Sequence, residues 1–272
     1  MTAQSKLEFV APLPPGRPPV RAAIFDFDGT ISTLRCGWED LMEPVMLRAL
    51  ARDGAVSEEL RREVRAYIFE STGIQTIHQM RWLAREVERR GGRPKDPWAY
   101  KADYNESLLV LIGERLRKLA EGVKTADDFL IKGSRALLGL LRDAGIALYA
   151  ASGTDHPDVL REAGRLGVLE YFSEVSGAPP GVDSCSKEAV LRRLLVEKNL
   201  TGPELAVIGD GKVEIALGRE AGALTIGVAS DEDKREGVNP VKRQKLIGAG
   251  ANVIVGDFTA GWQILGLLRG SR

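Results

Sequence analysis

The sequence has little cysteine, no excess of charge and no long hydrophobic run. Two cysteines in 272 residues, Cys36 and Cys185, are too few for a disulfide framework, and both are most simply small apolar fillers. The 38 basic residues balance 38 acidic ones, which gives no electrostatic case for a nucleic-acid partner. No apolar run approaches the roughly 18 to 20 residues of a membrane helix. We therefore expect a cytoplasmic protein that binds neither nucleic acid nor membrane.

The sequence also lacks internal repeats and a signal-peptide core. The first 19 residues are instead rich in proline, which interrupts any apolar stretch there. This composition predicts an irregular leader over residues 1–19, disordered or draped over the surface, in part as polyproline II. A protein partner for the leader is neither predicted nor excluded.

The most informative segment runs from Ala22 to Thr30. Its apolar first half predicts a buried strand. Asp26 and Asp28 follow two positions apart, so an extended chain places them on one face, and Gly29 then permits a sharp turn. Two neighbouring carboxylates are costly unless a cation lies between them or one holds a proton. The pattern favours Mg²⁺ and phosphoryl chemistry at the carboxyl end of a sheet.

From Val20 onward the chain alternates strand-like and helix-like segments, which is typical of an α/β fold with a mainly parallel sheet. The interval from Gly37 to Lys124 breaks this pattern, because it has helical periodicity and few strand signals. We predict an α/β core over residues 20–36 and 125–272, interrupted after its first strand by a helical insert over residues 37–124. Further strands are expected at residues 146–151, 205–208, 224–228 and 253–255, and helices at 134–142, at 187–197 and after Asp155.

Four short segments fall where a doubly wound sheet brings strand ends together. They are the Asp26/Asp28 pair, Ser152 after a strand, Lys187 at a helix start, and Asp210 with Glu214. Each alone has an ordinary explanation as a turn residue, a helix cap or a solvated charge. Lys187 is unusual in one respect, because a cation in a first helical turn opposes the helix dipole and suggests an anionic partner. It is the joint order and spacing of the four segments, rather than any one of them, that indicates a common functional site.

Together the segments resemble the signatures of the haloacid dehalogenase-like superfamily of aspartate-nucleophile phosphohydrolases. Residues 26–30 match its D-x-D-G-T signature in full, and Ser152 and Lys187 match its second and third. The fourth signature, G-D-x-x-x-D, is matched at residues 209–214 with Glu214 in place of the last Asp. The longer side chain leaves direct and water-mediated metal contact both open at that position.

The resemblance implies a Rossmann-like three-layer core with an all-helical cap inserted after the first strand. It implies that Asp26 attacks phosphorus to form an aspartyl-phosphate and that Asp28 is the general acid and base. Lys187 would neutralise charge shared by Asp26 and the phosphoryl group. The implied phosphate-binding residues are Gly29, Thr30, Ser152, Gly153 and Lys187. The implied Mg²⁺ ligands are Asp26, the main-chain carbonyl of Asp28, Asp210 and, directly or through water, Glu214.

Asp28 discriminates between branches of the superfamily. The dehalogenase and phosphonate-cleaving branches lack an acid two residues after the nucleophile, so Asp28 favours phosphate esters. The resemblance to the phosphoglycolate phosphatase and beta-phosphoglucomutase branch predicts a Mg²⁺-dependent phosphatase for a small phosphorylated metabolite, with a sugar phosphate preferred. A phosphomutase of the beta-phosphoglucomutase type is the alternative. A non-catalytic binding module that has kept the fold is a third possibility.

Substrate specificity is expected from the cap. Gln75 and His78 are candidates because they lie in a polar segment, residues 71–81, with Gly73 to open a loop. The alternative is an ordinary amphipathic helix with its polar side in water. His156, just after Ser152, is a candidate phosphate contact or a packing residue at a helix start. The charged segment 231–237 is expected to be a solvated loop, or alternatively part of the rim of the site.

Overall fold

The computed structural model describes residues 6–13, 16–51, 54–179, 181 and 187–270. The chain divides into two compact units: Met1–Cys36 with Lys124–Arg272, and Gly37–Val123. Within the described residues, no helix has both the length and the apolar character needed to cross a membrane. Cys185 and the segment just before Lys187 lie outside the described residues.

The larger unit contains a seven-stranded sheet with the strand order β1-β7-β6-β5-β2-β3-β4. Six strands are parallel, and β1 pairs antiparallel with β7. The strands are β1 (Glu8–Phe9), β2 (Ala22–Phe25), β3 (Ala147–Asp155), β4 (Glu174–Ala178), β5 (Leu205–Gly209), β6 (Leu224–Val228) and β7 (Val253–Val255). The central strands β2 and β5 consist entirely of buried residues, as expected for a parallel sheet covered on both faces.

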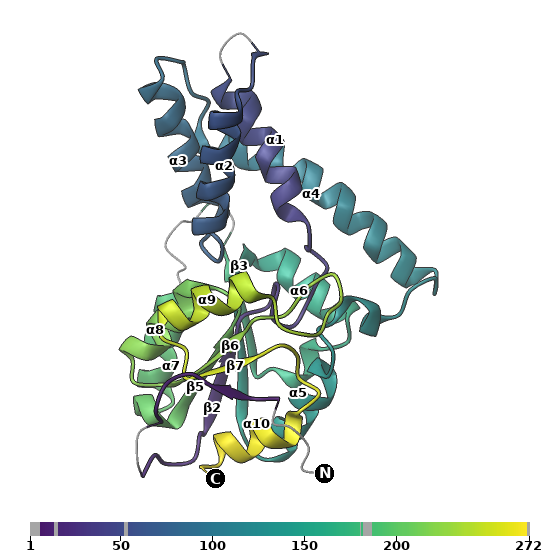
Figure 1. Cartoon of the computed structure of the whole chain (residues 1–272). Helices are drawn as coiled ribbons and strands as arrows, with labels where there is room; N and C mark the ends of the chain where they lie inside the picture. Colours follow the sequence, from purple (N-terminus) through teal and green to yellow (C-terminus); the bar gives the residue numbers. More distant parts are fainter. Residues whose placement is uncertain (1–5, 14–15, 52–53, 180, 182–186, 271–272) are drawn as a thin grey trace. The chain divides into compact units, whose positions relative to one another are not determined.

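Helices cover both faces of this sheet (Figure 1). The helices α7, α8 and α9 pack along one face, and α5, α6 and α10 lie on the other. Their bounds are α5 (Ser134–Asp143), α6 (His156–Arg165), α7 (Lys187–Glu197), α8 (Lys212–Glu220), α9 (Pro240–Ala249) and α10 (Gly261–Leu268). The result is the α/β fold with a mainly parallel sheet that the alternating pattern predicted, in the Rossmann-like three-layer form that the family resemblance implied.

The smaller unit is helical. It contains α1 (Trp38–Leu50), α2 (Glu58–Glu70), α3 (Thr76–Arg89) and α4 (Pro97–Ala120). These helices enclose their own apolar core, to which each contributes buried side chains, among them Met46, Val64, Leu83 and Leu108. Because that core is built within the unit, the packing of these helices does not depend on the sheet.

Several local signals in the sequence set the helix ends. Ser57 caps α2, since its hydroxyl accepts a hydrogen bond from Leu60 N. Asp96 caps α4 in the same way, and Pro97 stands at the first helical position, where its missing N–H costs nothing. Pro44 lies inside α1, four residues before Arg48 in the last turn.

The expected strands at 224–228 and 253–255 and the expected helix at 187–197 have the predicted bounds. Two strands were not anticipated. The edge strand β4 contains Gly177 and lacks the continuous run of buried apolar residues that marks β5 and β6, and β1 lies in the Pro-rich leader, where we expected no regular structure. Glu8 and Phe9 are held there by pairing with Ile254 and Val253, a contact between distant parts of the chain that local composition does not encode.

Candidate active site

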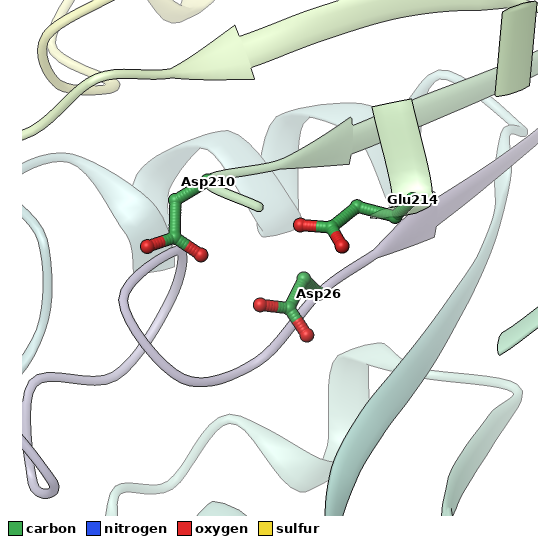
Figure 2. A group of neighbouring side chains, drawn as sticks. All are labelled: Asp26, Asp210 and Glu214. Atoms are coloured by element: carbon green, nitrogen blue, oxygen red, sulfur yellow. The ribbon is translucent and has the colours of Figure 1, made fainter. Parts of the chain in front are cut away.

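Asp26 and Asp210 come from the two central strands of the sheet. The strand β2 ends at Phe25 and β5 ends at Gly209, and the pairing of Phe25 with Ile208 brings the following residues side by side. The chain crosses from one side of β2 to the other between β4 and β5, so these strand ends flank the topological switch point. Both carboxylates are buried, and Figure 2 shows them facing the same space.

Gly29 allows the loop after β2 to approach Asp210 closely. Its φ is 76°, in the left-handed region that glycine adopts without strain. A Cβ at this position would also collide with the carboxylate of Asp210. The glycine of the D-x-D-G-T segment is therefore required for two reasons: it adopts the left-handed φ of the turn, and it leaves room for the carboxylate of Asp210.

Lys187 lies between two of the buried carboxylates. Its Nζ is 2.8 Å from Asp26 Oδ1 and 2.9 Å from Glu214 Oε2. Burial lowers the pKa of the Lys187 ammonium, but the charges of Asp26 and Glu214 outweigh it and hold that pKa above its ordinary value. Lys187 therefore stays charged, and the anionic partner expected from its place in a first helical turn is this carboxylate pair.

The carboxyl of Asp26 is in a different electrostatic situation from an exposed aspartate. Burial raises its pKa well above the ordinary value, the Lys187 ammonium opposes this, and the nearby carboxylates of Glu214 and Asp210 add to it. Like charges are thus crowded around Asp26, and a cation beside them would relieve the repulsion.

Asp28 is held by hydroxyl groups and a guanidinium rather than by a lysine. Its Oδ2 accepts hydrogen bonds from Ser152 Oγ at 3.0 Å and from Thr154 Oγ1 at 2.8 Å, both from β3. Its Oδ1 lies 3.6 Å from Arg35 Nε. The side chain keeps 25% of its surface exposed, compared with 8% for Asp26. The two aspartates of one short segment therefore have different surroundings.

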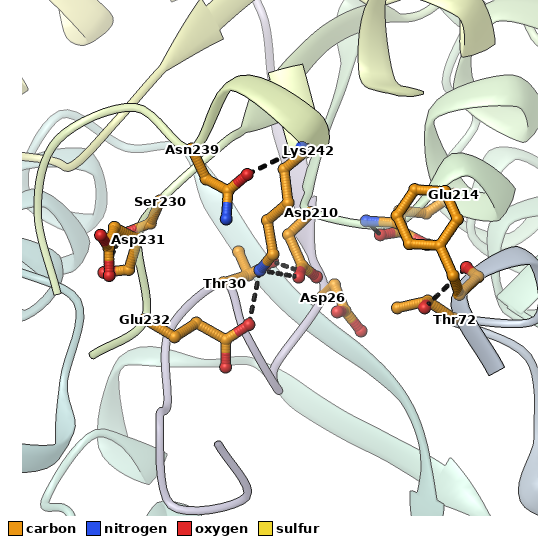
Figure 3. A network of polar contacts seen from close by, with 12 residues as sticks. Asp26, Thr30, Thr72, Asp210, Glu214, Ser230, Asp231, Glu232, Asn239 and Lys242 are labelled. Atoms are coloured by element: carbon orange, nitrogen blue, oxygen red, sulfur yellow. Dashed lines mark hydrogen bonds and ion pairs between the residues drawn. The ribbon is translucent and has the colours of Figure 1, made fainter. Parts of the chain in front are cut away.

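Lys242 and Glu232 join the site from the C-terminal part of the unit (Figure 3). Lys242 Nζ donates to Asp210 Oδ2 at 2.7 Å and to Glu232 Oε1 at 2.5 Å. Burial raises the pKa of Asp210, but the ammonium groups of Lys242 and Lys187, with a hydrogen bond to Asp26, together lower it overall. Glu232 belongs to segment 231–237, which we expected to be solvated or part of the rim; its side chain is 18% exposed and faces the site.

The acidic residues can hold a metal ion. Asp26, Asp210 and Glu214 are all buried, and each offers an oxygen within 4.8 Å of the other two (Figure 2). Carboxylate oxygens are the ligands that hard divalent cations prefer. Glu214 has a close contact on each oxygen, since Oε1 accepts from Gly211 N at 2.5 Å and Oε2 from Lys187 at 2.9 Å, whereas Asp210 Oδ1 has only the 3.4 Å contact with Thr30. The donor set therefore fits a divalent cation with Asp26 and Asp210 as its best-placed ligands.

The structure brings together many of the residues selected from the sequence. Thr30 is buried and its Oγ1 lies 3.4 Å from Asp210 Oδ1. Gly153 follows Ser152 within β3. His156 begins α6, and its Nδ1 accepts a hydrogen bond from Gly177 N at 3.3 Å, while a phosphate contact of His156 stays a prediction.

The two cap candidates occupy different environments on the helical unit. Gln75 is the buried residue that precedes α3, and His78 is exposed on its first turn. Gln79, in the same polar segment, donates from Nε2 to Ser71 Oγ at 3.0 Å and so ties α3 to the end of α2. A role of Gln75 or His78 in substrate binding stays a prediction.

Four residues of the site were not selected from the sequence: Arg35, Thr154, Glu232 and Lys242. A usable signal existed for Lys242, because Asn239-Pro240 predicts a helix start and places the lysine in the first turn. The same first-turn position was the feature that suggested an anionic partner for Lys187. Thr154 stands two residues after Ser152 in one strand, so the two hydroxyls share a face.

A family model for haloacid dehalogenase-like hydrolases matches residues 20–222, which include all four signature segments. No curated protein sequence matches the chain.

Solved structures of the same fold cover nearly the whole chain. A predicted phosphoglycolate phosphatase from Haemophilus somnus has 16% identity and a TM-score of 0.59, covering 90% of this chain and 97% of that one. A beta-phosphoglucomutase from Clostridium difficile has 15% identity and a TM-score of 0.64, covering 92% and 97%. A phosphonoacetaldehyde hydrolase-like protein from Oleispira antarctica has 15% identity and a TM-score of 0.60, covering 94% and 96%. At these identities the likeness shows a shared fold.

Proposed function

The chain belongs to the haloacid dehalogenase-like hydrolase family, and from that premise we propose that it is a Mg²⁺-dependent phosphatase of a small phosphorylated metabolite. The solved relatives include proteins described as a phosphoglycolate phosphatase and a beta-phosphoglucomutase, which supports a phosphate ester as the substrate class. A sugar phosphate is the preferred candidate.

The observation that carries the proposal is the contrast between Asp26 and Asp28. Asp26 is buried beside the Lys187 ammonium, whereas Asp28 is partly exposed and held by the hydroxyls of Ser152 and Thr154. Two carboxylates with different surroundings can perform two different tasks in one reaction.

Asp26 is the proposed nucleophile. A carboxylate oxygen of Asp26 forms a bond to phosphorus as the bond from phosphorus to the ester oxygen breaks, which leaves an aspartyl-phosphate. Lys187, 2.8 Å from Asp26 Oδ1, favours the ionised form of the attacking carboxylate against the effect of burial and offsets negative charge on the phosphoryl oxygens.

Asp28 is the proposed general acid and base. In the first step its carboxyl gives a proton to the departing ester oxygen. In the second step its carboxylate takes a proton from the water that attacks phosphorus, and Asp26 is released together with inorganic phosphate. The hydrogen bonds from Ser152 and Thr154 to Oδ2 fix the direction in which Asp28 faces.

Asp26, Asp210 and the main-chain carbonyl of Asp28 would hold Mg²⁺, with Glu214 as a direct or water-mediated ligand. When bound, the ion supplies positive charge that stabilises the phosphoryl group in the transition state. The helical unit would act as a cap that supplies specificity and keeps bulk water from the aspartyl-phosphate.

The first test is the release of inorganic phosphate from a panel of phosphorylated metabolites in the presence of Mg²⁺. The Asp26→Asn variant should be folded and inactive, because an amide oxygen does not displace the ester. Asp257→Asn is the matched control, since Asp257 is also a buried aspartate just after a core strand. It should retain activity.

The outcomes separate the candidate functions. Release that depends on Asp26 supports the phosphatase. Isomerisation of a sugar phosphate only after addition of a bisphosphate would instead indicate a phosphomutase, which uses the same aspartates. An Asp26→Asn variant with normal biological activity would indicate a non-catalytic binding module.

A further inference from the structure

Lys242 makes a contact that the four signature segments do not account for. Its Nζ lies 2.7 Å from Oδ2 of Asp210, and Asp210 is one of the proposed metal ligands. The lysine side chain is 19% exposed, so the ammonium is largely withdrawn from water. A buried ammonium is costly unless its charge is balanced.

The position of Lys242 is fixed by the start of its helix. Asn239 caps α9, since its Oδ1 accepts a hydrogen bond from the main-chain N–H of Lys242 (Figure 3) and another from that of Val241. Pro240 occupies the first helical position. A cation in this first turn opposes the helix dipole, so the location is favourable only with anionic partners. Asp210 and Glu232 are those partners.

Glu232 balances the charge that Lys242 brings. Its Oε1 accepts from Lys242 Nζ at 2.5 Å, so the ammonium is shared by two carboxylates (Figure 3). Without Glu232, a full positive charge would lie against a metal ligand and repel a divalent cation. With Glu232, the lysine can contact Asp210 while adding little net charge to the site.

We propose that Lys242 favours Mg²⁺ over Ca²⁺ by reserving one carboxylate oxygen of Asp210. This inference rests on the metal site of the proposed function. With Oδ2 engaged by the ammonium, Asp210 offers a metal ion a single oxygen, Oδ1, whose other neighbour is Thr30 Oγ1 at 3.4 Å.

Mg²⁺ and Ca²⁺ differ in whether they gain from binding both oxygens of one carboxylate. Mg²⁺ is small, keeps a near-ideal octahedron and binds carboxylates through single oxygens. Ca²⁺ takes six to eight oxygen ligands and gains from bidentate carboxylates. A site whose Asp210 is restricted to one oxygen therefore costs Ca²⁺ a ligand and costs Mg²⁺ nothing.

The test is direct titration of the metal-free protein with MgCl₂ and with CaCl₂ by calorimetry. Lys242→Met keeps the length of the side chain and removes the ammonium. It should bind Ca²⁺ more tightly, so that the ratio of the Ca²⁺ to the Mg²⁺ dissociation constant falls about tenfold. Lys234→Met is the matched control, because Lys234 is an exposed lysine of the neighbouring loop that pairs with Asp231. It should leave the ratio unchanged.

A second variant separates oxygen occupancy from charge. Glu232→Gln leaves Lys242 on Asp210 but removes one of its two neutralising carboxylates. Both ions should bind more weakly, by similar factors, with their ratio preserved. Thermal melting followed by circular dichroism establishes that each variant is folded.

The inference and the proposed function fail in different ways. If Lys242→Met binds both ions with an unchanged ratio, or if Glu232→Gln changes the ratio, Lys242 does not select the ion and the metal site itself stands. If the wild-type protein binds neither ion, the metal site and the role of Lys242 are both overturned.

Discussion

The guanidinium of Arg35 and the carboxylate of Glu162 form a two-point ion pair in the interior of the larger unit. Nη2 lies 2.6 Å from Oε1 and Nε lies 3.1 Å from Oε2, and Glu162 is fully buried. The same guanidinium is 3.6 Å from Oδ1 of Asp28. The pair thus anchors, on α6, a positive charge that faces the proposed general acid.

Arg35→Met should destabilise the larger unit by about 3–5 kcal/mol near pH 8, because it leaves a buried carboxylate without its partner. The loss should be smaller at pH 5. Burial raises the pKa of Glu162 and Arg35 opposes that rise, so removing Arg35 raises the pKa further. Glu162 can then take up a proton at mildly acidic pH and lose its charge.

The sign follows from proton linkage. A carboxyl whose folded pKa is raised contributes its full stability below its unfolded pKa, near 4.5, and loses it as the pH rises through the folded value. In Arg35→Met the folded pKa of Glu162 is higher, so the free energy of unfolding continues to fall up to a higher pH. Urea unfolding at pH 5 and pH 8 measures this free energy, and the double variant Arg35→Met with Glu162→Met, which lacks the carboxyl, is the control. Equal losses for the single variant at both pH values would contradict this account.

The sequence predicted the centre of the sheet and the residues directly after its strands, because hydrophobic runs and turn residues are local signals. Asp26, Ser152 and Asp210 all stand just after or at the end of short apolar segments whose composition predicts buried strands. Their meeting at one edge follows from parallel strands, without knowledge of any contact.

The contacts made by long charged side chains were not predicted. Glu232 stands in a run of charged residues, which local composition assigns to solvent, yet it reaches Lys242 ten residues further along. Arg35 and Glu162 are 127 residues apart, and nothing in either segment specifies the other. Such pairs are defined by the tertiary fold, and only the first-turn position of Lys242 left a trace in the sequence.

Ser152 and Thr154 both hydrogen-bond to Oδ2 of Asp28, so their removal should affect catalysis differently from substrate binding. Thr154→Val should lower kcat about tenfold and leave KM unchanged, because it loosens Asp28 through one hydrogen bond to a charged group. Ser152→Ala should lower kcat similarly and also raise KM, because Ser152 is a proposed phosphate ligand.

The double variant sharpens this prediction. With both hydroxyls gone, Oδ2 has lost both of these donors, and kcat should fall by at least the product of the two single effects. Steady-state kinetics on the preferred substrate measures all three variants. A rise in KM for Thr154→Val equal to that for Ser152→Ala would place both hydroxyls on the substrate instead.

His78 and Gln79 are neighbours on α3 with opposite exposure, which makes them a matched pair for testing the cap. His78→Ala should change the melting temperature little, because His78 is exposed, and should raise KM if the histidine contacts substrate. Gln79→Ala should lower stability by about 1–2 kcal/mol, because it breaks a buried hydrogen bond to Ser71. An unchanged KM in His78→Ala would remove the histidine from the list of specificity residues.

Glu214 replaces the aspartate that ends the fourth signature, and its two oxygens are already engaged. Oε1 accepts from Gly211 N and Oε2 from Lys187, while a Cβ at position 209 or 211 would collide with its side chain. The extra methylene is thus accommodated by two glycines. Of the two proposed modes, direct and water-mediated, these contacts favour the water-mediated one, with Lys187 linking Glu214 to Asp26.

Glu214→Gln should therefore weaken Mg²⁺ binding by about 10–100-fold, as expected when a group that supports the ligands is lost. Asp210→Asn should weaken it by a larger factor, because it removes a ligand oxygen's charge. Calorimetric titration of the two metal-free variants compares them directly. Equal losses in the two variants would mean that Glu214 is itself a ligand, and that its longer side chain reaches the ion directly.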